Sequence, residues 1–342
     1  MSRRALFLTL LLTSAAAAQG QEIGKFTVDG EVTCTALDAK DYGSLLGFAN
    51  GALTVFPTKW EKVIQLLPFP AHKKGITGGA FTPEGDFAVT ASLDGTLKVW
   101  DAETCKKYVL DKNEGQAPPV PTPKRTISAH TSGATAVTVS PTGEHILSGG
   151  TDGAIKVWDL KTGKLVHAIS GAHAGAVKGV QFRPKADQVV SAGADRLVKS
   201  WDTKKWTPVQ KSEAIKAPIN SLAVSPDGAR IAVAAGAPSK KDRVGPIRVL
   251  DAETLRESFT LKGHEDGTTC VAFHPAKEEL ASGGADKVIR VWDLGTKEQA
   301  SHAENAEPLR GLAITPASPR FAAVSATRVR WFNGFGERKK DD

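Results

Sequence analysis

Tryptophan closes a short, mostly β-branched run five times in this 342-residue chain, at positions 100, 158, 201, 292 and 331. Phe56 in "GALTVF" and Leu250 in "GPIRVLD" stand at the corresponding place in two further runs. The seven positions are separated by 44, 58, 43, 49, 42 and 39 residues. Such a period indicates a repeat architecture, in which each unit buries its apolar face against its neighbours. The chain is therefore predicted to form one domain of seven similar units.

Four of the units share a tighter register around a proline, at positions 83, 141, 184 and 275. A histidine lies eleven residues before each proline, an aspartate eleven residues after it, and a tryptophan six residues beyond the aspartate. A serine or threonine stands four residues before each aspartate. Chance does not produce these residue types at fixed offsets in four units. The four sets are His72, Thr90, Asp94 and Trp100; His130, Ser148, Asp152 and Trp158; His173, Ser191, Asp195 and Trp201; and His264, Ser282, Asp286 and Trp292.

These sets, with "AH…WD" in three units and "GH…WD" in the fourth, resemble the repeats of the WD40 (WD-repeat) family across residues 22–335. The resemblance implies an all-β fold, a seven-bladed β-propeller in which each blade is a four-stranded antiparallel sheet. It also implies that each set forms a buried hydrogen-bonded tetrad with a structural role. The first, fifth and seventh units depart from the pattern, which puts individual hydrogen bonds in doubt more than the fold.

Each predicted innermost strand carries a small residue five positions before the proline or its equivalent, as expected where strands crowd around a common axis. The last unit runs out after three strands, so residues 22–28, "EIGKFTV", are predicted to supply its outer strand and close the ring. The small residues are Cys34, Gly78, Ala136, Gly179, Ser221, Cys270 and Gly311.

Histidine, serine and aspartate are also the residue types of metal and catalytic sites. Each histidine, however, belongs to a different blade and lacks a second ligand at metal spacing. Each serine stands in a strand, without the sharp turn that presents a nucleophile. No phosphate-binding loop or haem-attachment motif occurs either. The sequence thus predicts no catalytic residue, no metal, no cofactor and no enzymatic activity.

Residues 1–18 have the three parts of a cleaved signal peptide: Arg3 and Arg4, an apolar centre over 5–13, and small residues over 15–18. They predict export to the periplasm or the outside of a bacterial cell, with the general and twin-arginine routes both open. No later run is long and apolar enough to form a transmembrane segment. Residues 336–342 are predicted to be a charged, flexible tail.

The formal net charge of +7 arises from basic residues that are scattered along the chain, which is typical of a solvated surface and argues against nucleic acid as a partner. Three cysteines do not form a disulfide framework. Cys34 and Cys270 are expected to be buried small side chains. Cys105 is expected to be an exposed thiol.

Two insertions distinguish the units. Residues 115–125, "GQAPPVPTPKR", are expected to be extended and exposed, either as a docking motif or as a passive loop. Residues 239–243, "SKKDR", extend the face that also receives the residues after each histidine. On this face we place a candidate partner-binding rim of Lys73, Lys74, Thr131, Ser132, Lys240, Lys241, Arg243, Glu265 and Asp266.

The chain is therefore interpreted as an exported scaffold that presents loops to a protein or peptide partner and works as a monomer. Two alternatives stay open. An exported propeller enzyme would bring acidic or histidine side chains together at one mouth of the central channel. A binder of polyanions, such as cell-envelope polymers, would cluster lysines in space.

Overall fold

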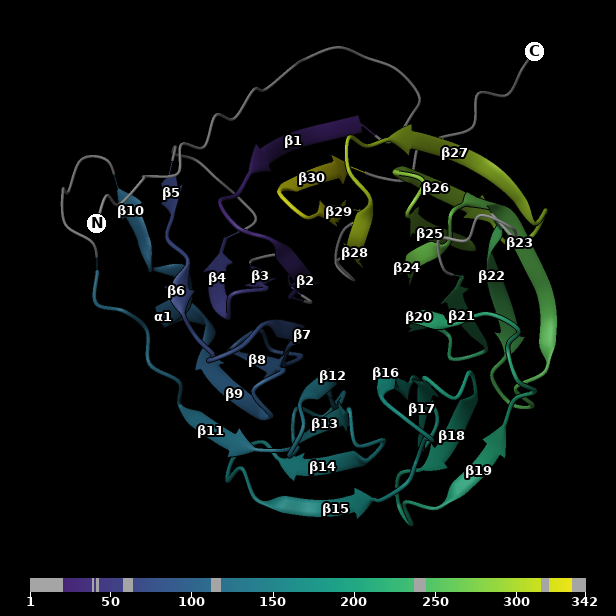
Figure 1. Ribbon diagram of the computed structural model, residues 1–342, viewed down its shortest axis with the longest axis horizontal. Coiled ribbons are helices and arrows are strands. Elements are labelled where there is room, and N and C mark those ends of the chain that lie inside the picture. The colour runs from purple at the N-terminus through teal and green to yellow at the C-terminus, as the bar shows by residue number, and fades with distance from the viewer. Residues whose placement is uncertain are drawn as a thin grey trace.

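The computed structural model describes residues 21–38, 40, 43–57, 64–111, 118–236, 244–314 and 320–333. The predicted signal peptide, the basic insertion at 239–243 and the charged tail lie outside the described residues. Within the described part, seven four-stranded antiparallel sheets stand in a ring around a common axis (Figure 1). The predicted seven-bladed propeller is confirmed.

The four strands of each blade run in order from the axis outward. Blade 1 has β2 (Val32–Leu37), β3 (Ser44–Phe48), β4 (Ala52–Phe56) and β6 (Phe69–Pro70). Blade 2 has β7 (Ile76–Phe81), β8 (Phe87–Ser92), β9 (Thr96–Asp101) and β11 (Arg125–Ser128). Blade 3 has β12 (Ala134–Val139), β13 (His145–Gly150), β14 (Ile155–Asp159) and β15 (Leu165–Ile169). Blade 4 has β16 (Val177–Arg183), β17 (Gln188–Gly193), β18 (Val198–Asp202) and β19 (Pro208–Lys211).

The remaining blades follow the same order. Blade 5 has β20 (Ile219–Val224), β21 (Arg230–Ala235), β22 (Val244–Asp251) and β23 (Glu257–Glu265). Blade 6 has β24 (Thr268–Phe273), β25 (Glu279–Gly284), β26 (Val288–Asp293) and β27 (Glu298–Glu304). Blade 7 has β28 (Leu309–Ile314), β29 (Arg320–Ser325), β30 (Arg328–Asn333) and, as its outer strand, β1 (Gln21–Thr27).

Strand β1 closes the ring by pairing antiparallel with β30, with Lys25 opposite Arg330 and Thr27 opposite Arg328. The chain then enters blade 1 through β2, so the first and last described strands, β1 and β30, lie side by side in blade 7. This agrees with the closure predicted from residues 22–28, shifted by one residue. Pairing the termini in one sheet satisfies an edge of β30 that would otherwise be open.

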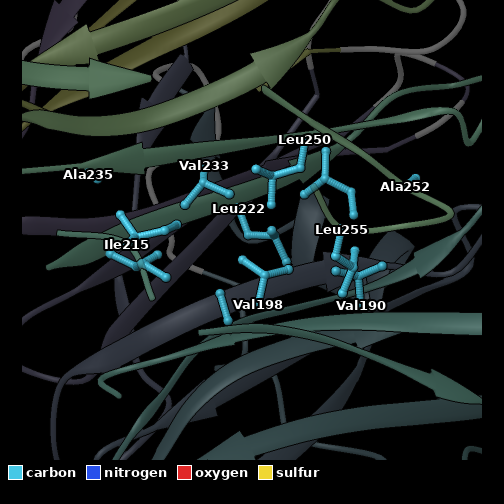
Figure 2. Close-up of a cluster of buried hydrophobic side chains, with 12 residues drawn as sticks. Val190, Val198, Ile215, Leu222, Val233, Ala235, Leu250, Ala252 and Leu255 are labelled. Atoms are coloured by element: carbon cyan, nitrogen blue, oxygen red, sulfur yellow. The ribbon is translucent and has the colours of Figure 1, made fainter. Parts of the chain in front are cut away.

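The strands change character from the axis outward because their environments differ. The second strand of blades 2 to 6 is buried along nearly its whole length, as expected for a strand with packed neighbours on both faces. The outer strand β19 is exposed throughout. The apolar core lies between blades: Val190 and Val198 of blade 4 pack with Leu222 and Val233 of blade 5 (Figure 2).

A small addition joins blades 1 and 2 outside the repeat. Strand β5 (Ile64–Leu66) pairs with β10 (Val109–Asp111), and between β9 and β10 lies the short helix α1 (Ala102–Lys106). The side chain of Asp101 caps this helix by accepting a hydrogen bond from the amide of Thr104. Because Cys105 lies on the buried side of α1, it is only 1% exposed, and burial raises the pKa of its thiol to about 12. The expectation of an exposed Cys105 is therefore wrong.

Candidate functional site

The histidine-containing sets form continuous hydrogen-bonded chains. In blade 4, the Trp201 indole donates to Ser191 Oγ at 2.8 Å, and Ser191 Oγ lies 2.8 Å from His173 Nε2. His173 Nδ1 lies 2.8 Å from a carboxylate oxygen of Asp195. One proton arrangement satisfies every contact: the serine hydroxyl donates to Nε2, and Nδ1–H donates to the carboxylate. The same contacts recur in blades 2, 3 and 6.

Within each tetrad, the polar side-chain atoms are hydrogen-bonded to one another. The side chain of each of the four histidines is 0% exposed. A basic residue two positions before each tryptophan adds a further contact: Lys199 Nζ donates to the Ala172 carbonyl at 2.6 Å, and Arg290 donates to Asp286 at 2.7 Å. Such saturated buried networks fix one packing arrangement and leave no nucleophile or ligand atom free for chemistry.

Blade 5 fills the same positions with apolar side chains. The Ile215 amide donates to the Arg196 carbonyl, just as the His173 amide donates to Gly153 in the blade before. Ile215 therefore takes the place of the histidine, while Val233 and Leu250 take those of the serine and tryptophan, and all three lie in one buried cluster (Figure 2). Blade 1 does the same with Val28, Leu46 and Phe56.

Strand pairing corrects one position of the sequence repeat. Trp201 lies opposite Val189 in blade 4, and the residue in the corresponding place of blade 7 is Phe332, opposite Phe321. Trp331 therefore lies on the other face of β30, where it meets Phe56 of blade 1 edge-on at 6.5 Å between ring centroids. The assignment of Trp331 to the repeat position was wrong by one residue, which in a strand reverses the face.

Acid is expected to destabilise the protein through the buried histidines. Burial is the main cause that lowers the pKa of His72 to about 4, against about 6.5 in an unfolded chain. Between these values the unfolded chain binds a proton that the folded chain excludes, so the free energy of unfolding falls as the pH falls. His72 alone accounts for up to about 3 kcal/mol of this loss. Burial lowers the pKa of His130, His173 and His264 in the same direction.

Urea unfolding at pH 7, 5.5 and 4.5 measures this effect, and the midpoint is expected to fall at each step. The variant His302→Gln, which removes an exposed imidazole, should reproduce the profile of the unaltered chain. The pKa of Asp94 is also lowered, to about 2, because hydrogen bonds from Thr96 and from the Lys73 amide outweigh burial. Its contribution is lost only below about pH 4. A midpoint that stays constant from pH 7 to 4.5 contradicts this account.

A ring of polar side chains surrounds the axis where the innermost strands begin. Each of these strands has a β-bulge between its first residue and its small residue. The residue between these two, which we call the bulged residue, links neighbouring blades in several cases. The Thr77 hydroxyl donates to the carbonyl oxygen of Ala91 in its own blade and to that of Ala134 in the next blade. Asn220 Nδ2 does the same toward Gly236 and Thr268. The seven bulged residues are Thr33, Thr77, Thr135, Lys178, Asn220, Thr269 and Arg310.

A cavity of about 460 Å³ opens inside this ring, over blades 5, 6, 7 and 1, and we call it the mouth cavity. Small turn residues leave the space for it: Gly236, Ala285 and Ala326 lie where blade 2 carries Leu93. Arg310 lines the cavity and pairs with Glu31 at 2.6 Å, and both side chains are nearly half exposed. The further lining residues are Thr33, Pro218, Asn220, Asp266, Gly267, Thr269, Pro308 and Leu309.

The predicted rim residues are spread around this face. Asp266 lines the mouth cavity and has a φ of +60°, a left-handed conformation that is uncommon for a residue with a side chain. Glu265 is exposed beside it. Exposed and away from the cavity lining are Lys73, Lys74, Thr131 and Ser132. Outside the described residues lie Lys240, Lys241 and Arg243.

Sequence reasoning missed the bulged residues, although a pattern could have found them. They stand directly before the seven small residues, and most are threonine or asparagine, types that are unusual in a strand packed on both sides. The arrangement they create is a concave surface with amide, hydroxyl, guanidinium and carboxylate groups. Such a surface can bind a ligand by hydrogen bonds and charge. Within the described residues, no three histidine, cysteine, aspartate or glutamate side chains are grouped to hold a metal ion.

The described part of the proline-rich insertion is mostly exposed, as expected, with one exception. Pro119 and Val120 are exposed, but Pro121 is buried. Recognition of a Pro-x-x-Pro segment requires both prolines to enter the grooves of a partner. Because Pro121 is the second of the only such pair in the insertion, the structure favours the passive loop over the docking motif. Among the described residues, no helix has the length and apolar character needed to cross a membrane.

Comparison with known proteins gives two family matches. A family model described as "Nucleolar protein 10-like, N-terminal domain" matches residues 23–242, and one described as "WD domain, G-beta repeat" matches residues 255–293. The chain is 31% identical to the Periodic tryptophan protein 2 homolog of Mus musculus over 77% of its length, but that match covers 26% of the mouse protein. It is 24% identical to the Caenorhabditis elegans homolog over 80% of its length, covering 23% of that protein.

A relative of more similar length is Eukaryotic translation initiation factor 3 subunit I of Drosophila ananassae. It is 24% identical over 80% of this chain and 84% of its own length. The chain thus spans about a quarter of the periodic tryptophan proteins and most of the initiation factor subunit. These relatives are animal proteins, so the similarities give no support to the bacterial origin expected from residues 1–18.

Proposed function

Because the chain belongs to the family of the nucleolar protein 10-like N-terminal propeller domain and carries WD40 repeats, we propose that it is a protein-binding scaffold without catalytic activity. The mouth cavity is the observation that supports this most. It combines space with polar groups that solvent can reach, such as Arg310 and Asp266. Blade 6 beside the cavity is held by a tetrad, and blades 5 and 1 are held by buried apolar side chains at the same positions, so the cavity is largely formed before a partner arrives.

The partner is proposed to be a protein segment that inserts a side chain into the mouth cavity. Ala285 and Ala326 lie at turn positions where blade 2 tolerates Leu93, whose side chain is 43% exposed. The double variant Ala285→Trp/Ala326→Trp should therefore fold and fill the cavity. We expect it to lose the proteins that co-purify with the unaltered chain from an extract of the source cells.

A matched control is Ala194→Trp, at the same turn position in blade 4, where the side chain is exposed and does not line the cavity. This variant should keep the co-purifying proteins. Retention of every partner by the double tryptophan variant, or equal loss in the control, would argue against docking at the mouth.

The two alternative functions have less support. For an enzyme, the cavity lining offers one acidic side chain, Asp266, and no histidine among the described residues. For a polyanion binder, the cavity offers Arg310, which already pairs with Glu31. A peptide, with both charges and hydrogen-bonding groups, matches this mixed surface better than a uniformly charged polymer does.

Export is also proposed, on the strength of the three-part pattern of residues 1–18. The mature chain would then begin near Gln19. Intact-mass measurement of the protein purified from its source tests this proposal: the mass should correspond to a chain that lacks the first eighteen residues. A mass that includes them shows that the segment is retained.

A further inference from the structure

A second cavity, of about 370 Å³, lies on the opposite face of the ring, where the innermost strands end. We call it the lower groove. Its walls are the turns that follow β16, β20 and β24, from blades 4, 5 and 6. Phe273 and Leu294 add apolar surface to the lining, as do Pro226 and Pro275.

The blade 6 wall of the groove is fixed by a buried histidine. Nδ1 of His274 accepts hydrogen bonds from the amides of Ala276 and Lys277, at 3.0 and 2.9 Å. Blade 5 has Ser225 in the same place, and its hydroxyl accepts from the Arg230 amide. Because these side chains hold the turns by direct hydrogen bonds, the groove is shaped before any ligand binds.

Charges along the groove divide into paired and unpaired groups. Glu278 pairs with Arg230 at 3.3 Å, whereas Asp227 keeps its negative charge and accepts hydrogen bonds from Ser225 and from the Ala229 amide. Lys185 and Lys277 are exposed, and no carboxylate of the described residues lies within ion-pair distance of either. Two ammonium groups beside an apolar lining are thus left to interact with a ligand.

We infer that the lower groove is a second binding site, which takes an acidic peptide segment with an apolar side chain between its carboxylates. Carboxylates would pair with Lys185 and Lys277, and the apolar side chain would lie against Phe273 and Leu294. A polyanion without apolar side chains would pair with the lysines but leave the apolar lining uncovered, so the groove favours the peptide. The site is independent of the mouth cavity, since the two lie on opposite faces of the ring.

The test is fluorescence anisotropy with a labelled peptide of sequence Glu-Glu-Leu-Glu-Leu-Glu, titrated with the full chain. We expect saturable binding that weakens about tenfold or more, equivalent to ~1.4 kcal/mol or more, in Lys185→Glu/Lys277→Glu. The matched control is Lys161→Glu/Lys164→Glu, which makes the same charge change at exposed lysines in the β14–β15 turn of the same face. That control should bind within about twofold of the unaltered chain.

Three outcomes would overturn the inference: no saturation up to about 1 mM protein, equal weakening in the two double variants, or equal binding of a peptide with serine in place of leucine. The Ala285→Trp/Ala326→Trp variant should bind the acidic peptide as the unaltered chain does. Binding at the lower groove can therefore be judged even if docking at the mouth cavity is disproved. All the altered side chains are exposed or line a cavity, and a thermal unfolding scan confirms that each variant is folded.

Discussion

Removal of strand β1 is expected to lower the free energy of unfolding by about 5 kcal/mol and to make the protein self-associate. Six residues of β1 pair with β30, and the net contribution of each hydrogen bond in such a ladder is about 1 kcal/mol. Without β1 the outer edge of β30 presents unpaired amide and carbonyl groups, which can pair with the same edge of a second copy. Among the described strands, β1 is the one that comes from the N-terminal end of the chain and completes the last blade, and the deletion removes it.

The measurement compares a chain that begins at residue 19 with one that begins at residue 28, by urea unfolding and by sedimentation. The shorter chain should unfold at lower urea and sediment partly as a dimer or larger species. The control is a synthetic peptide of residues 19–28, added in excess to the shorter chain. By pairing with β30 in place of β1, it should restore the urea midpoint and the sedimentation of a single chain. Equal midpoints for the two chains would show that β1 does not close the ring.

Replacement of the serine in a tetrad is expected to lower the free energy of unfolding strongly, although it removes a single hydroxyl group. Ser191→Ala removes the oxygen that lies 2.8 Å from both His173 Nε2 and Trp201 Nε1. These two residues are only 3% and 4% exposed, so water cannot replace the lost partner. Leaving two buried polar groups unsatisfied costs about 3 kcal/mol, which urea unfolding would record as a lower midpoint.

The chain itself supplies the control, because blade 5 has an apolar set at the same three positions. The triple variant His173→Ile/Ser191→Val/Trp201→Leu copies Ile215, Val233 and Leu250 into blade 4. The triple variant should recover at least half of the free energy of unfolding lost in Ser191→Ala. It removes the imidazole and the indole N–H, which Ser191→Ala leaves buried without a hydrogen-bond partner. If Ser191→Ala unfolds at the same urea concentration as the unaltered chain, the tetrad is not a source of stability.

Fold and framework were predictable from sequence because they repeat. The offsets among His173, Asp195 and Trp201 recur in four units, and each recurrence checks the others. Prediction failed where that check was missing. Trp331 was misplaced because it was assigned by residue type alone, in a unit that lacks the turn aspartate whose offset would have pointed away from it; the repeat position is held by Phe332. Cys105 was misjudged because α1 interrupts only one blade.

The mouth cavity was only partly predictable. Its face follows from the positions of the histidines, and Asp266 belongs to the rim predicted from sequence. Its position over blades 5, 6, 7 and 1 depends on side-chain volume at turns that are distant in sequence, as the contrast between Leu93 and Ala285 shows. The polar residues before the small residues could have been noticed in the sequence, but the bulges that bring Asn220 and Arg310 into the ring are backbone features that the alternation of a strand does not show.

Docking at the mouth is the central claim, and hydrogen exchange tests it most directly. A partner recovered with the unaltered chain is added back, and the exchange of backbone amides is compared with and without it. The account predicts slower exchange at cavity-lining amides, with the outer strands β15 and β19 unchanged. These amides belong to Asn220, Asp266, Gly267, Thr269, Leu309 and Arg310. Slower exchange confined to those outer strands, with the mouth segments unaffected, would contradict it.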